Sequence, residues 1–195
     1  MLLPLLITLV IVVALLRGGS LRNFAALPLR WTPLVVGAFV LQLLIFTPLL
    51  KTPIITFATV PLYLLSMAFA TVWVALNWRI PGMPLIALGL LLNFAAIAAN
   101  GGHMPTSPES ARIAGKIAGY ATQGPPILKN SILGSGDQVR LWLLTDIIAI
   151  PKAVPLANVF SIGDVLLAVG IGILCYRTVR RAPAAATTTR SSYEA

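Results

Sequence analysis

Acidic residues are scarce in this sequence of 195 residues, and charge of either sign is sparse. Five Asp and Glu stand against fourteen Lys and Arg, and charged residues together make up 10% of the chain. Apolar residues make up 58%, and the mean hydropathy is +0.93, values typical of membrane proteins. The composition excludes a soluble globular protein and predicts an integral membrane protein, with membrane lipid as its first partner.

Cysteine and histidine occur once each, as Cys175 and His103. A single cysteine forms neither an internal disulfide nor a thiolate metal cage, and a single histidine without a second ligand nearby makes a weak metal site. No histidine lies within an apolar run, where haem or chlorophyll would most simply need one. The basic residues are scattered singly and form no stripe for nucleic acid. We therefore expect no metal, no cofactor and no nucleic-acid partner.

Long apolar runs predict five membrane-spanning helices, each near the roughly twenty residues that cross the hydrocarbon core. They lie at residues 1–16, 31–50, 54–76, 84–99 and 156–176. The first run lacks the positive n-region of a cleaved signal peptide, so we expect it to be retained. The predicted fold class is all-α: a polytopic membrane helix bundle in one transmembrane domain, residues 1–181. The low-complexity residues 182–195 are expected to form a disordered cytoplasmic tail.

The basic residues predict an orientation in a bacterial plasma membrane. None precedes the first run, and those that follow the first, third and last runs are Arg17, Arg22, Arg30, Arg79, Arg177, Arg180 and Arg181. Loops rich in Lys and Arg stay on the cytoplasmic side. We therefore expect the N-terminus outside, the C-terminus in the cytoplasm, and residues 100–155 in an outer loop.

The outer loop contains a pattern typical of a short amphipathic helix. Thr106-Ser107-Pro108-Glu109 matches a capping box with proline in the first turn. Ile113, Ile117 and Tyr120 then recur at helical spacing. We expect residues 108–121 to form an interfacial helix with these side chains toward lipid or protein.

A second feature of the loop is the apolar run LWLLTDIIAI at residues 141–150. Ten residues are too few to span a membrane, so we expect a re-entrant or interfacial segment. If this segment is helical, Pro151 and Pro155 turn the chain from it into the fifth span.

Few polar side chains lie in the middle of the predicted spans. Asn93, Gln42 and Ser66 are expected to form interhelical hydrogen bonds, because polar groups join membrane helices in this way.

Asp146 and Asp164 are the acidic residues that lie within apolar sequence. A carboxylate at membrane depth costs a few kcal/mol, so one that is present there usually faces a polar cavity or a partner. With helices on both sides of the proline turn, the two side chains reach comparable depth near the outer face. Two carboxyl groups brought together share a proton, and such a pair can act as base and acid on a water molecule.

The same region resembles the C-terminal part of the lipoprotein signal peptidases, which are aspartyl intramembrane enzymes. In that family the first catalytic aspartate follows an apolar run, and the second lies in a Phe-Asn-x-Ala-Asp motif that opens the last span. Here the motif reads Phe160-Ser161-Ile162-Gly163-Asp164, and the interval of eighteen residues from Asp146 matches a spacing found in that family. The resemblance covers about residues 141–176. It implies that Asp146 and Asp164 cleave a membrane-anchored peptide.

A catalytic pair at Asp146 and Asp164 also predicts supporting residues. Ser161 and Asn158 would orient the pair, and the amides of Asn100, Gly101 and Gly102 would stabilise the developing oxyanion. The peptidase motif Gly-Asn-x-x-Asp-Arg has no counterpart just upstream of Asp146. The chain as a whole resembles more closely a bacterial family of small multi-pass membrane proteins that carry Asn-Gly-Gly-x-Met-Pro and Phe-Ser-x-Gly-Asp.

Structural alternatives remain open for every candidate residue. Each aspartate can cap a helix or bond a neighbour such as Thr145, Asn158 or Ser161, and Asn100-Gly101-Gly102 can end the fourth helix with left-handed glycines. Three functions follow: an aspartate-pair hydrolase, a noncatalytic subunit bound to other membrane subunits, and a carrier or lipid-binding protein. The separation of the two carboxyl groups discriminates the first from the second.

Overall fold

The computed structural model describes residues 2–46, 54–122, 131–134 and 136–180. The end of the predicted second span and the predicted tail at 182–195 lie outside the described residues. The fold is mostly helical, and its long helices are α1 (Leu2–Leu16), α2 (Thr32–Phe46), α3 (Thr59–Leu76), α4 (Met83–Ala99) and α7 (Ile162–Val179). Each falls within or close to one predicted span.

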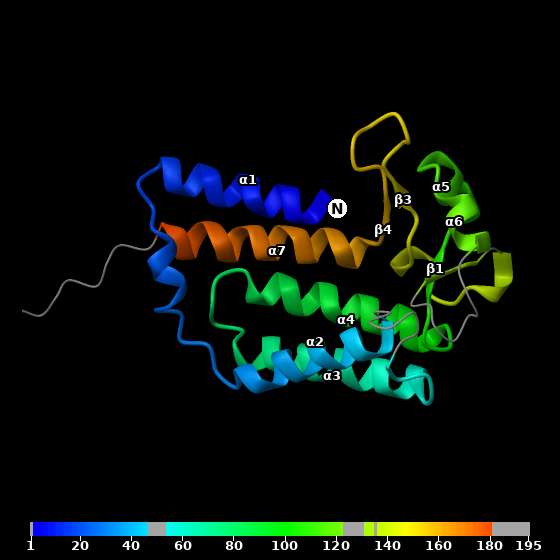
Figure 1. The fold of residues 1–195 in the computed structure, drawn as a ribbon, viewed down its shortest axis with the longest axis horizontal. Helices are drawn as coiled ribbons and strands as arrows, with labels where there is room; N and C mark the ends of the chain where they lie inside the picture. Colours follow the sequence, from blue (N-terminus) through cyan, green and yellow to red (C-terminus); the bar gives the residue numbers. More distant parts are fainter. Residues whose placement is uncertain (1, 47–53, 123–130, 135, 181–195) are drawn as a thin grey trace, which may run out of the picture.

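The long helices lie side by side in the order α1, α7, α4, α3, α2, and each packs on the next (Figure 1). Helices α3 and α7 each have 18 residues and are long and apolar enough to cross a membrane. Shorter apolar helices are formed by α2, by α4 and by residues 7–16 of α1. Only 28% of the residues in α3 and in α7 are buried, whereas the core helix of a soluble protein is mostly buried.

Glycines allow α4 and α7 to approach closely. A Cβ atom built on Gly89 would lie 2.6 Å from the carbonyl oxygen of Gly163, and one on Gly170 would lie 2.8 Å from that of Gly82. The two pairs are seven residues apart on each chain segment, about two helical turns, so they fall on one face. Small residues at such spacing are a general way for membrane helices to pack tightly.

The third and fifth helices begin later than the sequence pattern predicts. Helix α3 starts at Thr59, after Ala58 with φ of +49°, instead of at residue 54. Helix α7 starts at Ile162 instead of residue 156, because Leu156 has φ of +67° and Ser161 caps the helix.

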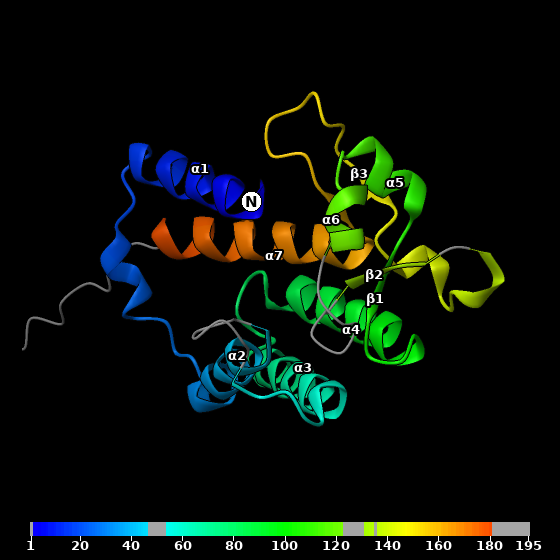
Figure 2. The same cartoon turned by 45° about the vertical axis from the view of Figure 1, so that its right-hand side comes forward.

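The described residues between 100 and 161 lie over one end of the helices (Figure 2) and are called the outer segment below, for their place at that end. Here β1 (Met104–Thr106) pairs in parallel with β2 (Ser131–Leu133), and β3 (Ile148–Ala149) pairs with β4 (Val159–Phe160). Short 3₁₀ turns lie at η3 (Gly136–Gln138) and η4 (Trp142–Leu144), and at η1 (Leu21–Phe24) near the other end. These two small sheets correct the all-α expectation to a mostly helical fold.

Residues 141–150 are not a helix, contrary to the geometry on which the proline-turn argument relied. After the single turn η4, the Thr145 hydroxyl donates to the carbonyl of Trp142 at 2.7 Å, and the backbone becomes extended. Asp146 then forms a parallel bridge with Thr106, and β3 follows. The β-branched Ile147 and Ile148 favour this extended path.

The predicted interfacial helix at 108–121 is divided into α5 (Pro108–Ile113) and α6 (Ile117–Thr122). The break is at Gly115, which has φ of +66°. The N-cap is Ser107 instead of Thr106. Ile113 and Ile117 are 39% and 43% exposed, but Tyr120 turns inward.

Candidate functional site

Asp164 is held at the first turn of α7 by three groups. Its backbone amide donates to the Ser161 hydroxyl at 2.9 Å, and its Oδ2 accepts from the Ser161 amide at 3.2 Å, which completes a capping box. Its Oδ1 accepts from the side-chain amide of Asn93 on α4 at 2.8 Å. Both oxygens of Asp164 thus serve as hydrogen-bond acceptors.

Asn93 is itself fixed by α7. The Ser161 hydroxyl donates to Asn93 Oδ1 at 2.8 Å, and a Cβ atom built on Gly163 would lie 1.9 Å from the same oxygen. Asn93 is 8% exposed and Ser161 fully buried. Residue 163 must therefore be glycine for Asn93 to reach Asp164.

Asp146 is positioned by the edge of β1. Its amide donates to the Pro105 carbonyl at 3.0 Å, and its carbonyl accepts from the Ser107 amide at 3.0 Å. The fully buried Thr106 lies between these residues, and its hydroxyl donates to Asp146 Oδ2 at 3.3 Å. The Asp146 side chain is therefore directed by backbone pairing that depends on a segment forty residues earlier.

The Thr106 hydroxyl connects Asp146 to two further hydroxyl groups. Tyr120 of α6 donates to it at 3.1 Å, and Ser131 of β2 lies 2.8 Å from it. The Thr106 hydroxyl has a single proton, which it donates to Asp146. Ser131 must therefore be the donor in its bond with Thr106. Two polar groups of the outer segment thus converge on Thr106 and, through it, on one carboxyl oxygen.

The two carboxyl groups interact electrostatically. Burial, and then the charge of Asp164, raise the pKa of Asp146 to about 7, while the hydrogen bond from Thr106 opposes this rise. The phenol of Tyr63 on α3 is 8% exposed and lies within electrostatic range of both carboxyl groups. Tyr63 also packs edge-on against Phe46 of α2, with ring centroids 4.9 Å apart. The site therefore joins α3, α4 and α7 to the outer segment.

Residues 26–176 match a family of unknown function, DUF5317. The chain belongs to this family. No curated protein and no solved structure matches the chain. The part of the chain shared with DUF5317 contains every side chain of the site described above, whereas α1 lies before it.

The Asn100-Gly101-Gly102 motif, also predicted for the site, closes a helix in the DUF5317 fold. Asn100 ends α4, and its side chain pairs with both backbone groups of Arg140, at 2.8 and 2.9 Å. The Gly102 amide donates to the Ile97 carbonyl at 2.9 Å, and Gly101 and Gly102 have φ of +70° and +88°. These residues terminate the helix, the alternative that the sequence left open, and the Gly102 amide is used in doing so.

Asn158 contributes its backbone carbonyl to Ile150 at 2.8 Å, which extends the β3–β4 hairpin. Its side chain donates to neither aspartate among the described residues. Ser161, by contrast, holds Asp164 as predicted for a residue that orients it.

Sequence reasoning missed Tyr63, Thr106 and Ser131 as members of the site, and placed Asn93 only as an interhelical partner. The proximity of Asn93 to the motif at Phe160–Asp164 had a signal in the glycines, because Gly82 and Gly89 repeat at the same interval as Gly163 and Gly170. Nothing local marks the other three. Within the described ranges, no three His, Cys, Asp or Glu side chains are grouped as metal ligands.

Proposed function

We propose that the protein is an integral membrane protein with five spans, α1, α2, α3, α4 and α7. The five helices are adjacent and mutually aligned, and each runs opposite to the one before it in the chain, so that α7 lies parallel to its neighbour α1 (Figure 1). The large apolar side chains on their outer surfaces are exposed, as lipid contact requires; they include Val36, Phe39, Leu65, Val72, Leu91 and Val169.

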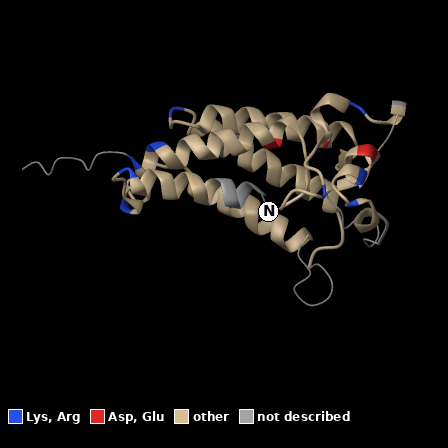
Figure 3. Cartoon of the chain, turned by 90° about the horizontal axis from the view of Figure 1, so that it is seen from above, with Lys and Arg blue, Asp and Glu red and all other residues tan. Residues whose placement is uncertain are grey.

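Charge supports the orientation with the N-terminus outside. Lys and Arg lie at both ends of the helices, and the acidic residues lie toward one of them (Figure 3). The end that carries the loops 17–31 and 77–82 has Arg17, Arg22, Arg30, Arg79, Arg177 and Arg180, whereas the described Lys and Arg of the opposite end are Arg112, Lys116, Arg140 and Lys152. The excess of arginines marks the first end as cytoplasmic. A test is impermeant thiol labelling of intact cells in a Cys175→Ser background: Lys152→Cys should react and Ser192→Cys should not, and the reverse pattern would invert the topology.

We propose further that Asp146 and Asp164 act together as a hydrolase that cleaves a membrane-anchored peptide. The observation that carries this proposal is that the Asp146 carboxyl, held beside β1, lies within electrostatic range of the Asp164 carboxyl at the start of α7, and that the Tyr63 phenol lies within the range of both. Two carboxyl groups with different hydrogen-bond environments are a general arrangement for paired acid and base roles. The resemblance to the signal peptidases supports the same assignment.

The chemistry follows from the two environments. Asp164, with both oxygens used as acceptors, takes a proton from a water molecule, whose oxygen then attacks the peptide carbonyl carbon. Asp146, whose pKa of about 7 keeps its proton near neutral pH, donates that proton to the leaving nitrogen as the C–N bond breaks. The products are a carboxylic acid and an amine. One water molecule is consumed, and transfer of the proton from Asp164 to Asp146 returns the pair to its starting state.

The deciding experiment compares the N-termini of membrane proteins in cells with wild-type protein and with variants. Asp146→Asn and Asp164→Asn should each lower turnover by at least about 10³-fold, because residues that act as one unit fail together. Glu109→Gln is the matched control, since Glu109 lies in the same outer segment and is paired with Arg112. Tyr63→Phe should have a smaller effect.

The outcome against this proposal is also definite. If both asparagine variants are inserted, thermally stable and unchanged in every processed N-terminus, the hydrolase is wrong. A noncatalytic subunit in which Asp164 is a helix cap would then explain the site better.

A further inference from the structure

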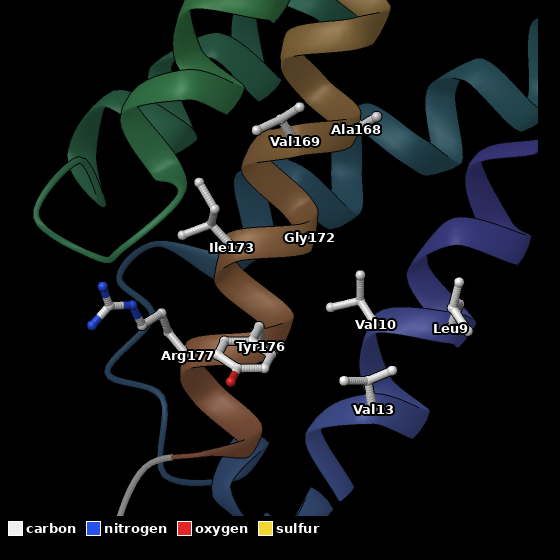
Figure 4. A pocket seen from close by; sticks show the side chains of 9 residues that line it. All are labelled: Leu9, Val10, Val13, Ala168, Val169, Gly172, Ile173, Tyr176 and Arg177. Carbon is white, nitrogen blue, oxygen red and sulfur yellow. The ribbon is translucent and has the colours of Figure 1, made fainter. Parts of the chain in front are cut away.

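An apolar groove lies between α1 and α7, on the far side of α7 from α4. Its volume is about 610 Å³, within the roughly 300–1,000 Å³ typical of small-molecule sites. The walls are side chains of both helices, and the small residues Ala168 and Gly172 make the hollow (Figure 4). The lining residues on α1 are Leu9, Val10 and Val13.

Basic groups lie where the apolar walls end. Tyr176 and Arg177 line the groove at its cytoplasmic end. Arg17 donates from its guanidinium to the Tyr176 hydroxyl at 3.2 Å, and the Arg180 guanidinium donates to the Arg17 carbonyl. The guanidinium groups of Arg17, Arg177 and Arg180 therefore lie near one end of the apolar groove.

No carboxylate of the described residues pairs with these arginines. Asp146 and Asp164 lie toward the other end of the helices, and Glu109 is paired with Arg112 at 2.6 Å (Figure 3). The positive charge at the mouth of the groove is therefore left for a ligand or for counterions.

A second cavity adjoins the same arginine. It has a volume of about 440 Å³ and is lined by Arg79 and Arg177, with Pro28, Pro81 and Thr178 among its other walls. Arg177 thus stands between an apolar groove on one side and a cavity that holds a second guanidinium on the other. An amphiphile with one long apolar chain and an anionic head matches this order of surfaces.

The groove is held open by contacts at its cytoplasmic end. The Ser20 amide and the Asn23 side chain both donate to the Val179 carbonyl, at 2.8 and 3.0 Å. These bonds fix the end of α1 to the end of α7, so a ligand meets a preformed site.

We propose that this groove binds one anionic phospholipid of the cytoplasmic leaflet, with an acyl chain along Val10, Ala168 and Gly172 and the phosphate at Arg177 and Arg79. Basic pockets between membrane helices on the cytoplasmic side suit such headgroups. A partner helix would bury the same apolar wall but would leave the guanidinium groups without countercharge. The inference rests on the five-span placement proposed above and is independent of peptide cleavage.

The experiment is native mass spectrometry of the full-length protein in detergent, with phosphatidylglycerol and phosphatidylcholine of identical acyl chains as probes. Phosphatidylglycerol should bind at one site, about tenfold or more tighter than phosphatidylcholine. Arg177→Gln should weaken it about fivefold, the effect of one arginine at an anionic surface. Arg22→Gln, at the same end but away from the groove lining, is the matched control.

A second variant tests the apolar part. A Cβ atom at Gly172 would lie 3.9 Å from Val10 Cγ2, an ordinary contact, so Gly172→Leu should fill the groove without disturbing the backbone and should weaken both lipids. Gly37→Leu, on the exposed face of α2 with open space around it, is its control. Arg177→Gln keeps the proposal testable if Gly172→Leu fails to insert.

Three results would overturn the inference: equal binding of the two lipids, binding unaffected by both variants, or a dimer of the chain that excludes lipid from the groove. Asp146→Asn should bind phosphatidylglycerol like wild type. The two proposals can therefore fail separately. The lipid preference can persist when the asparagine variants disprove the hydrolase, and peptide cleavage can be found when the two lipids bind equally.

Discussion

The two ends of the row of helices differ in how deeply their charged side chains are buried. At the end that carries the outer segment, two carboxyl groups are half-buried, each with defined hydrogen-bond donors. At the other end, Arg17, Arg177 and Arg180 are exposed, and guanidinium groups adjoin two cavities. A charge that is buried needs specific partners and has its proton affinity changed, whereas an exposed charge keeps its usual state and attracts counterions. The first end can therefore hold a proton on a carboxyl group near neutral pH, and the second end attracts anions.

One structural device is shared by both ends. Asn77 closes α3 and pairs with the amide and carbonyl of Arg30, at 2.8 and 3.0 Å, as Asn100 closes α4 and pairs with Arg140. These clamps fix the connecting loops to the helices. The difference between the ends therefore arises from the charged side chains and not from how their loops are attached.

The most damaging substitution should be Gly163→Val, at the buried end. Its Cβ would meet Asn93 Oδ1 at 1.9 Å, which forces α4 and α7 apart and removes two hydrogen bonds, at a cost of about 3 kcal/mol or more. Thermal unfolding in detergent measures the effect. Gly172→Ala on the same helix is the matched control and should change the midpoint little; equal midpoints for both variants would contradict the packing account.

Asn93→Ala should follow, with a loss of about 1–3 kcal/mol, because the Asp164 carboxylate and the Ser161 hydroxyl lose their partner in a buried place. Gln42→Ala is the comparison variant within the helices α2 and α3. It removes only the 3.1 Å bond to Ser66 and should lower the free energy of unfolding by less than Asn93→Ala does. A double-mutant cycle of Asn93→Ala with Ser161→Ala should show coupling. Strict additivity would mean that the two residues act independently.

A pH titration separates the ends by their protonation. The pKa of Asp146 is raised to about 7 in the fold, so folding favours its neutral form. The stability that this provides is fully present at a pH below the unfolded value and is lost as the pH rises through about 7. The unfolding midpoint of wild type should therefore fall from pH 5 to pH 8, and Asp146→Asn should flatten the profile. Arg177→Gln should leave its slope unchanged; an Asp146→Asn profile as steep as wild type would disprove the assignment.

The smallest effect is expected at the exposed ion pair of the outer segment. Glu109 and Arg112 lie 2.6 Å apart but are 61% and 68% exposed, so Glu109→Gln should shift the unfolding midpoint very little, and high salt should remove even that shift. Unfolding midpoints at low and high ionic strength measure it. A larger loss would show that exposure is a poor guide to the value of charges in this protein.

Local pattern was sufficient for the helices and for several contacts. Each of the five apolar runs overlaps one long helix, the interhelical hydrogen bonding expected of Gln42 and Ser66 is found as a bond between the two, and the helix-ending role of Asn100-Gly101-Gly102 was among the alternatives. What failed is the segment 141–150, because its extended conformation depends on pairing with β1 about forty residues earlier. Hydropathy measures burial but not the partner, and a run of apolar residues fits a short helix and a strand equally well.

The candidate site divides in the same way. Asp164 and Ser161 are three residues apart, so a capping motif predicts their contact. Asp146 reaches its surroundings through Thr106, Tyr120 and Ser131, which lie on three separate elements. No spacing rule connects those residues, since the strand β1 and the break at Gly115 that bring them together are themselves tertiary features.

The position of α1 beside α7 has a consequence for synthesis. Helix α1 is synthesised before α7, on which it packs, and the bond from the Ser20 amide to the Val179 carbonyl joins residues that are made far apart in time. At about 5–20 residues per second, α1 exists for roughly 8–30 seconds before α7 does. A nascent chain therefore has α1 without this neighbour until α7 is made, so closure of α1 onto α7 is a late step in folding.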